Sequence, residues 1–334
     1  MRVSFALVAV VIASACVADD PRLPAGRATP TPVPPAAPGG LVYVERTVLK
    51  RYDPQSGESE RLGRLPSADV AVSPDGARYV VVEETSPQGP GPEGFRDPAL
   101  LVGELSGEAP PAPLGPGRAP LWSPDGTLVA AIAPDAAGAE RVLVYRPGGA
   151  DAPETVLAGD LFTLIGWSGD AIIAASTMTG KVFRAAPGAE PATLDVALVN
   201  LWGASPTGDA LLVVADDRAS FRGPDGVTDI ALERPALGDG AFSPDGALVA
   251  AAVVEPQATR LVMIEVATGA VTEVPESDGT QGQVVWEADG DRFAYARTVP
   301  GRAQRLEAVV CTTDLACERA FEWAEGVQLL SLSE

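Results

Sequence analysis

The stretch VAVSPDGARYVVVEE at residues 70–84 decides the fold, because it is the first of six related segments. Each segment has an apolar or aromatic residue, a turn related to Ser-Pro-Asp-Gly, and then an apolar run. Glycine accepts the positive φ of a tight turn, so Asp-Gly between two apolar runs predicts a β-hairpin. The other segments are LWSPDGTLVAAIAP (121–134), IGWSGDAIIAAS (165–176), WGASPTGDALLVVAD (202–216), GAFSPDGALVAAAVV (240–254) and VVWEADGDRFAYAR (284–297).

The six segments recur with a period of about 43 residues. The spacings are 50, 45, 37, 38 and 44 residues, counted between Ser73, Ser123, Ser168, Ser205, Ser243 and Glu287. Further along each repeat, a second pair of apolar segments flanks a Gly-bearing turn, as in RLVMIEVATGAVTEVP at 260–275. Four short strands in each 40–45-residue period are typical of a β-propeller blade.

The repeat resembles the PD40 repeat of TolB-like and WD40-like propellers over about 280 residues. Gly169 shortens one copy, Thr207 replaces Asp in another, and Glu287-Ala288 replaces Ser-Pro in the last, while VATGAVTEV (266–274) matches the second hairpin. The resemblance implies an all-β propeller of four-stranded antiparallel blades, and it leaves activity open because propellers include enzymes, receptors and scaffolds. The turn residues of the three intact copies, with structural roles, are Ser73, Asp75, Gly76, Ser123, Asp125, Gly126, Ser243, Asp245 and Gly246.

The two ends of the repeat region predict the number of blades. Residues 41–66 read as three strands without a preceding Ser-Pro-Asp-Gly strand, and VQLLSLSE at 327–334 reads as one strand. Pairing these fragments completes a seventh blade and removes two exposed sheet edges. The 294 residues from 41 to 334 give 42 per blade for seven blades and 49 for six, so seven is preferred and six is the alternative.

The first 40 residues read as a targeting segment and a tether. Arg2, the apolar run 3–12 and Ala13-Ser14-Ala15 predict a signal peptide at 1–15. The small residues before Cys16 resemble a bacterial lipobox, which predicts a lipidated Cys16, and ordinary cleavage with secretion is the alternative. Residues 16–40 form a Pro-rich tether. We therefore expect an exported lipoprotein, anchored to the membrane through its lipid only and facing the periplasm or the cell exterior.

Cys311 and Cys317 are the other two of the three cysteines, in the segment CTTDLAC. Two sulfurs without a histidine do not complete a zinc site. Outside the cytoplasm, such a pair favours a short disulfide across one hairpin. With the four strands of a blade lettered a to d in chain order, we expect this disulfide in the c–d hairpin of the last full blade.

Composition excludes several classes of function. The formal net charge is −21 with a pI near 4.3, which argues against nucleic acid and anionic membranes as partners. The absence of histidine excludes a Ser-His-Asp triad and His-ligated zinc. The aromatic residues that precede the turns, Trp122, Trp167, Phe242 and Trp286, are interpreted as contacts between blades. A monomer is expected.

The excess of acidic residues is the one feature of the composition that suggests a binding site. The d–a and b–c connections of a propeller share one face, and mapping the chain onto that scheme gathers acidic residues there. Such a group could bind Ca²⁺, which prefers six to eight oxygen ligands, although a solvated acidic rim is the simpler interpretation. The residues are Asp69, Asp160, Asp239 and Asp278 near d–a connections, and Glu83, Glu84, Asp135, Asp216, Asp217 and Glu255 near b–c connections. The five named as candidate Ca²⁺ ligands are Asp216, Asp217, Asp239, Glu255 and Asp278.

Two functions fit these observations. The first is a non-catalytic, lipid-anchored propeller that serves as a binding or assembly module of the bacterial cell envelope, without a cofactor. Its partner would be an envelope protein or a small ligand on a propeller face. The second is a Ca²⁺-assisted propeller enzyme, similar to a lactonase or lyase, that uses the acidic residues at the channel mouth.

Overall fold

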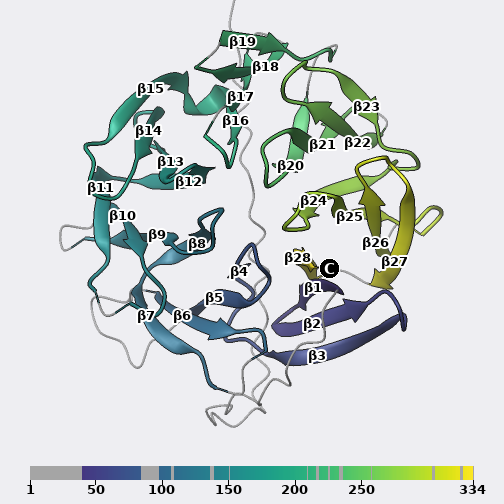
Figure 1. Cartoon of the computed structure of the whole chain (residues 1–334), viewed down its shortest axis with the longest axis horizontal. Helices are drawn as coiled ribbons and strands as arrows, with labels where there is room; N and C mark the ends of the chain where they lie inside the picture. The colour runs from purple at the N-terminus through teal and green to yellow at the C-terminus, as the bar shows by residue number, and fades with distance from the viewer. Residues whose placement is uncertain are drawn as a thin grey trace, which may run out of the picture.

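The computed structural model describes residues 40–83, 98–106, 109–135, 139–149, 151–208, 210–215, 218–224, 226–232, 236–256, 258–302, 305–323 and 326–333. Within these residues, 28 strands form seven four-stranded antiparallel sheets, arranged as the blades of a ring (Figure 1). One short 3-10 helix, η1 (Leu198–Asn200), accompanies them. The predicted all-β propeller with seven blades is confirmed, and the six-bladed alternative is wrong.

Each blade runs outward from the centre of the ring, from strand a to strand d (Figure 1). Blades 2 to 4 comprise β4 (Val70–Val72), β5 (Arg78–Glu83), β6 (Ala99–Glu104) and β7 (Ala112–Pro116); β8 (Arg118–Trp122), β9 (Val129–Pro134), β10 (Glu140–Tyr145) and β11 (Glu154–Asp160); and β12 (Phe162–Ser168), β13 (Ala171–Ser176), β14 (Lys181–Ala185) and β15 (Ala192–Ala197). Blades 5 to 7 comprise β16 (Leu201–Ala204), β17 (Leu211–Ala215), β18 (Arg218–Gly223) and β19 (Gly226–Asp229); β20 (Leu237–Phe242), β21 (Leu248–Val254), β22 (Thr259–Glu265) and β23 (Val271–Glu273); and β24 (Thr280–Trp286), β25 (Arg292–Thr298), β26 (Leu306–Thr312) and β27 (Cys317–Trp323).

Blade 1 closes the ring with strands from both ends of the described chain. Its strand a is β28 (Val327–Ser333), which pairs with β1 (Gly40–Glu45), followed by β2 (Val48–Asp53) and β3 (Glu58–Arg64). The register places Leu41 opposite Leu332. The closure predicted from the two partial repeats is therefore present, and it leaves no inner strand of the ring unpaired.

The core lies between neighbouring blades. The second strand of each blade is buried on both faces, which explains its Ala- and Val-rich sequence; every residue of β13 (AIIAAS) is buried. One apolar cluster joins Ile132 of blade 3 to Ile172 of blade 4, and equivalent clusters join other neighbouring blades. Stability therefore depends on contact between all neighbours around the ring.

The Ser-Pro-Asp-Gly turns are built around a buried serine hydroxyl. Ser123 Oγ accepts a hydrogen bond from the Leu128 amide at 2.9 Å and donates to Asp125 Oδ1 at 2.6 Å. The Gly126 amide donates to the Ser123 carbonyl at 2.9 Å, and Gly126 has a φ of 69°. The hairpin differs from a two-residue Asp-Gly turn, because the six residues 123–128 connect β8 to β9 and, of these, only the glycine has a positive φ. Asp125 instead receives hydrogen bonds from its own loop.

The last full repeat keeps this turn without its serine. Glu287 takes the serine position, and the same backbone hydrogen bonds form: the Glu287 amide donates to the Arg292 carbonyl at 2.9 Å, and the Gly290 amide donates to the Glu287 carbonyl at 3.0 Å. The buried Glu287 carboxylate binds the Arg292 guanidinium through both oxygens, at 2.8 and 2.5 Å. An ion pair thus replaces the hydroxyl of the other repeats.

Tryptophans near the ends of the inner strands join successive blades. The indole Nε1 atoms of Trp122, Trp167 and Trp286 each donate a hydrogen bond of 3.1 Å to a carbonyl in strand a of the preceding blade. Trp202 donates instead to Gly238 of the following blade, at 2.7 Å, and packs against Phe242. These aromatic residues therefore hold blades together, as interpreted from the sequence.

Two further features concern stability and location. The disulfide expected between Cys311 and Cys317 is present and joins β26 to β27 in blade 7. In the part of the chain that the structure describes, no helix is long and apolar enough to cross a membrane. Cys16 and the tether up to residue 39 lie outside the described residues, and Gly40 belongs to β1, so the lipid anchor stays a prediction.

Candidate functional site

The acidic residues singled out in the sequence occupy the predicted connections. Asp69, Asp160 and Asp278 lie where strand d passes to strand a, and Asp239 lies within β20, which is a strand a. Glu83 is the last residue of the b strand β5, and Asp135 and Glu255 directly follow a strand b. We call the face with these connections the upper face. Glu84, Asp216 and Asp217 lie outside the described residues.

Several of these carboxylates serve their own loops. Glu255 forms an ion pair with Arg260, which also contacts Glu273 at 2.7 Å. The Asp135 carboxylate accepts a hydrogen bond from the Ala139 amide at 2.9 Å. Among the described residues, no group of three or more Asp, Glu or Cys side chains is placed to hold a metal ion. The described residues therefore do not form the set of ligands that the Ca²⁺ hypothesis requires.

The opposite face, which carries the a–b and c–d turns, has an acidic hollow of about 510 Å³ at blade 7. Its carboxylates belong to Glu287, Asp289, Asp291 and Asp314, and Arg292 with Thr312 and Thr313 completes the lining. The Glu287 carboxylate forms an ion pair with Arg292, and the Asp289 carboxylate accepts a hydrogen bond from the Asp291 amide at 2.9 Å. These two contacts stabilise the turn itself.

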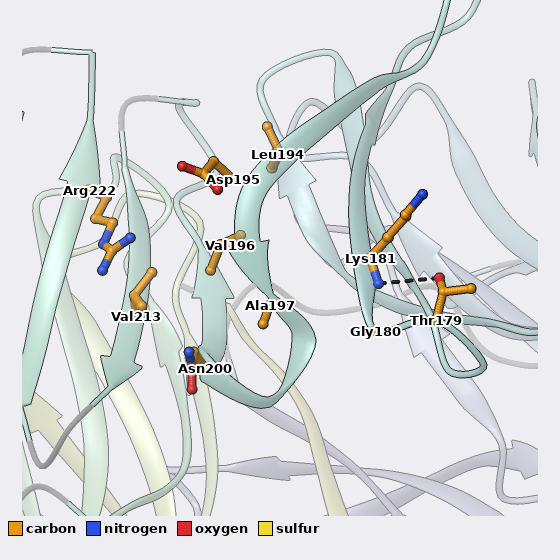
Figure 2. A pocket seen from close by; sticks show the side chains of 10 residues that line it. All are labelled: Thr179, Gly180, Lys181, Leu194, Asp195, Val196, Ala197, Asn200, Val213 and Arg222. Carbon is orange, nitrogen blue, oxygen red and sulfur yellow. Dashed lines mark hydrogen bonds between the residues drawn. The ribbon is translucent and has the colours of Figure 1, made fainter.

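A groove of about 350 Å³ lies between blades 4 and 5, and we call it the blade 4–5 groove. One side is β15 with the b–c turn of blade 4, and the other side is formed by β17 and β18 of blade 5. Figure 2 shows the residues that line it: Thr179, Gly180, Lys181, Leu194, Asp195, Val196, Ala197, Asn200, Val213 and Arg222.

The floor of the blade 4–5 groove is apolar. Val213 is 1% exposed, and Leu194 and Val196 pack against the cluster that fills the interface of blades 4 and 5. Apolar side chains therefore fill the interface of blades 4 and 5 beneath the groove, and the groove itself is open to solvent. Polar groups ring this floor, with Asn200 at the end formed by η1 (Figure 2).

Two opposite charges lie at the groove. Figure 2 shows Asp195 on β15 and Arg222 on β18 at the two sides of the groove, with the Arg222 guanidinium beside Val213. Among the described residues, Arg222 forms no ion pair within 4 Å, either with Asp195 or with another carboxylate. The Lys181 side chain points away from β15, so its contribution to the lining is its backbone. Within the described residues, the groove thus offers a cation without an ion pair beside an apolar floor.

None of these groove residues was singled out from the sequence. Their side chains come from three strands, the b–c turn of blade 4 and a 3-10 helix, and no local motif connects Asp195 with Arg222. One signal was present: the upper connections of blade 4, STMTGK (176–181) and ALVN (197–200), contain no acidic residue in a chain with 45. That local depletion marks a surface different from the acidic rim.

The sequence matches no protein-family model, and a search of curated proteins finds no significant match. Solved structures resemble the fold. TolB from Acinetobacter baumannii shares 15% identity with a TM-score of 0.51, over 88% of this chain and 66% of that chain. The fold is that of a TolB-like propeller. The chain thus spans slightly less than two thirds of this TolB.

Enzymes share the same fold. The acylaminoacyl peptidase of Pyrococcus horikoshii gives a TM-score of 0.58 at 13% identity, over 84% of this chain and 52% of that chain. A protein from Bacteroides fragilis, provisionally named a 6-phosphogluconolactonase, gives 0.54 at 14% identity, over 88% and 98% of the two chains. At these identities the likeness concerns the fold alone, because one fold hosts many functions.

Proposed function

We propose that this TolB-like propeller is a non-catalytic binding module of the bacterial cell envelope, held at the membrane by a lipid on Cys16. The blade 4–5 groove carries the proposal. It combines an apolar floor with Asp195, Asn200 and Arg222, a combination suited to recognition. An envelope protein or a small ligand would occupy a propeller face, and neither a cofactor nor nucleic acid is required.

The chemistry of the chain supports binding over catalysis. It has no histidine, so no imidazole can activate a serine. The Ser–Asp pairs recur in three equivalent turns, at Ser73, Ser123 and Ser243, where each hydroxyl also accepts a backbone amide of its own hairpin. Their repetition and burial are typical of a structural role.

Export is supported by the disulfide between Cys311 and Cys317, since such bonds persist outside the reducing cytoplasm. Lipidation can be tested by fractionation of cells that express the wild type or Cys16→Ser. We expect the wild type in the membrane fraction and the variant in the soluble fraction, because stable anchoring depends on the acyl chains. An unchanged membrane fraction for the variant would contradict the anchor.

A Ca²⁺-assisted enzyme is the second candidate, favoured by the acidic residues of the upper face. It can be tested by thermal melting during a Ca²⁺ titration. A site that binds only the folded state should add about 2.7 kcal/mol at a concentration 100 times the dissociation constant. A melting temperature that does not respond up to millimolar Ca²⁺ would remove this candidate and leave the binding module.

A further inference from the structure

The outermost strands of the seven blades differ in how their free edges are protected. Each d strand pairs with one neighbour only, so its outward N–H and C=O groups can accept another strand. Two of these strands are short, β19 with four residues and β23 with three. The other four besides β15 carry prolines or several charges: β7 (APLGP), β3 (ESERLGR), β11 (ETVLAGD) and β27 (CERAFEW).

Strand β15 lacks these protections. Its sequence, ATLDVA, has six residues, no proline or glycine, and the single charge of Asp195. It is also the d strand that borders the blade 4–5 groove. The least protected edge of the ring therefore adjoins a ready-made groove.

A bulge interrupts the pairing of β15 where this strand borders the groove. The pairing of β14 with β15 shifts between Lys181 and Val182, whose partners are Ala197 and Leu194, so that Asp195 and Val196 have no opposite residue. The four consecutive residues from Leu194 to Ala197 all border the groove; Leu194 and Val196 are half-buried against the blade 4–5 interface, and Asp195 and Ala197 are exposed. The irregularity thus leaves Asp195 and Val196 without β14 partners beside the groove.

Exposed apolar side chains lie at the upper end of the same groove. Val199 is 89% exposed and Met178 is 71% exposed, the two highest values for large apolar residues in the described chain. Val199 precedes Asn200 in η1, and Met178 precedes Thr179 in the b–c turn, so both flank lining residues. A hydrogen bond of 3.0 Å from the Leu198 amide to the Gly180 carbonyl fixes these two connections together.

We propose that the outer edge of β15 is a docking site for an extended segment of a partner protein, which adds to blade 4 as a fifth strand. The segment's main chain pairs with the free edge, alternate apolar side chains cover Val196 and the exposed Val199, and a carboxylate of the segment binds Arg222. The inference rests on the proposed binding function and names its partner. A second copy of the chain fits this edge poorly, because two chains of net charge −21 repel each other.

The test uses a phage-displayed library of random dodecapeptides, selected on the full mature protein. Enriched peptides are synthesised, and their affinities are measured by fluorescence anisotropy for the wild type, Asp195→Pro and Arg222→Glu. Asp195 lies in the bulge without a β14 partner, so proline blocks the edge with little effect on the sheet. Arg218→Glu is the matched control, since Arg218 lies at the other end of β18 and does not line the groove.

We expect peptides with alternating apolar residues and one acidic residue. Their affinity should fall about tenfold or more in both groove variants, as for the loss of one or two hydrogen bonds, and stay unchanged in Arg218→Glu. Hydrogen exchange of the wild type should slow at residues 193–197 when peptide is bound. If Asp195→Pro melts below the wild type, Arg222→Glu alone decides the outcome.

Four results would overturn the docking site. Peptides that bind the groove variants as tightly as the wild type would place binding elsewhere and leave the binding-module function standing. A dimer in sedimentation that Asp195→Pro dissolves would assign the edge to self-association. Binding of the non-lipidated domain to phospholipid vesicles, lost in Val199→Glu, would assign the exposed apolar residues to a membrane. Failure to enrich any peptide would also remove the proposed partner class, whereas the envelope location depends on the Cys16→Ser result.

Discussion

At the scale of single residues, the fold depends on a few buried hydrogen-bonding groups that shape each a–b turn. The Ser123 hydroxyl holds the pKa of Asp125 below its usual value; burial opposes this effect, and the Thr127 amide adds to it. A depressed folded-state pKa stabilises the protein above the unfolded pKa of about 3.9, and the contribution disappears as the pH falls through the folded value. The turn is therefore sensitive to acid.

Substituting Asp125→Ala tests this acid sensitivity. We expect the free energy of unfolding at pH 7 to fall by about 1 kcal/mol, the typical net value of lost hydrogen bonds. The difference from the wild type should be smaller at pH 3, because the unfolded state binds a proton there that folded Asp125, with its lowered pKa, resists. Urea unfolding at both pH values measures it, and Asp170→Ala, in the shortened turn of blade 4, is the control. An equal difference at both pH values would show that the charge of Asp125 has no part in the effect.

The ion pair that replaces serine in blade 7 gives a second residue-scale prediction. Glu287 is 2% exposed at its side chain and Arg292 is 35% exposed, so Glu287→Gln leaves a partly solvated guanidinium. We expect a loss of about 1–3 kcal/mol, below the 3–5 kcal/mol for a fully buried pair because solvent screens Arg292. Thermal or urea unfolding measures it. Asp289→Asn, in the same turn, should stay near the wild type, and equal losses for both variants would contradict the role of the pair.

At the scale of elements, hairpins could be predicted from the sequence because their signals are local. Ser123, Asp125 and Gly126 lie within four residues, so the turn and its flanking strands are visible as one motif. Even the register of Cys311 with Cys317 follows from their shared hairpin. The groove could not be predicted in this way, because Asp195 and Arg222 meet only when blades 4 and 5 pack, and the bulge in β15 has no sequence signature.

The disulfide of blade 7 is expected to stabilise its hairpin modestly. Because it closes a short loop, loop entropy predicts a loss of about 2 kcal/mol of unfolding free energy when it is reduced. Urea unfolding with and without reductant measures this loss, and mass spectrometry after alkylation counts the free thiols. A double variant, Cys311→Val with Cys317→Ser, should show no response to reductant. Two free thiols in exported, unreduced protein would contradict the bond.

At the scale of the whole molecule, the ring is held together by similar apolar interfaces between neighbouring blades. Each apolar cluster is shared by two neighbours, so opening any interface exposes two faces at once. Blade 1 differs from the other blades, because its four strands are not consecutive in the chain. Its inner strand, β28, comes from the other end of the sequence than β1, β2 and β3. The pairing of β28 with β1 therefore determines whether the seven blades form a closed ring.

Deleting residues 326–334 is expected to destabilise the entire domain. The deletion removes β28, which buries Val327, Leu329 and Leu332 at 6%, 4% and 5% exposure, and leaves the edge of β1 unpaired. Burial of three such side chains contributes about 5 kcal/mol or more, a large part of the stability of an ordinary domain. The melting temperature should therefore fall far more than it normally does when nine terminal residues are removed. Termini tolerate truncation when their backbone is unpaired, and the backbone of β28 is paired with β1. Deletion of residues 17–38, which precede β1, is the control and should melt like the wild type; if both deletions do so, the pairing of β28 with β1 does not hold the ring closed.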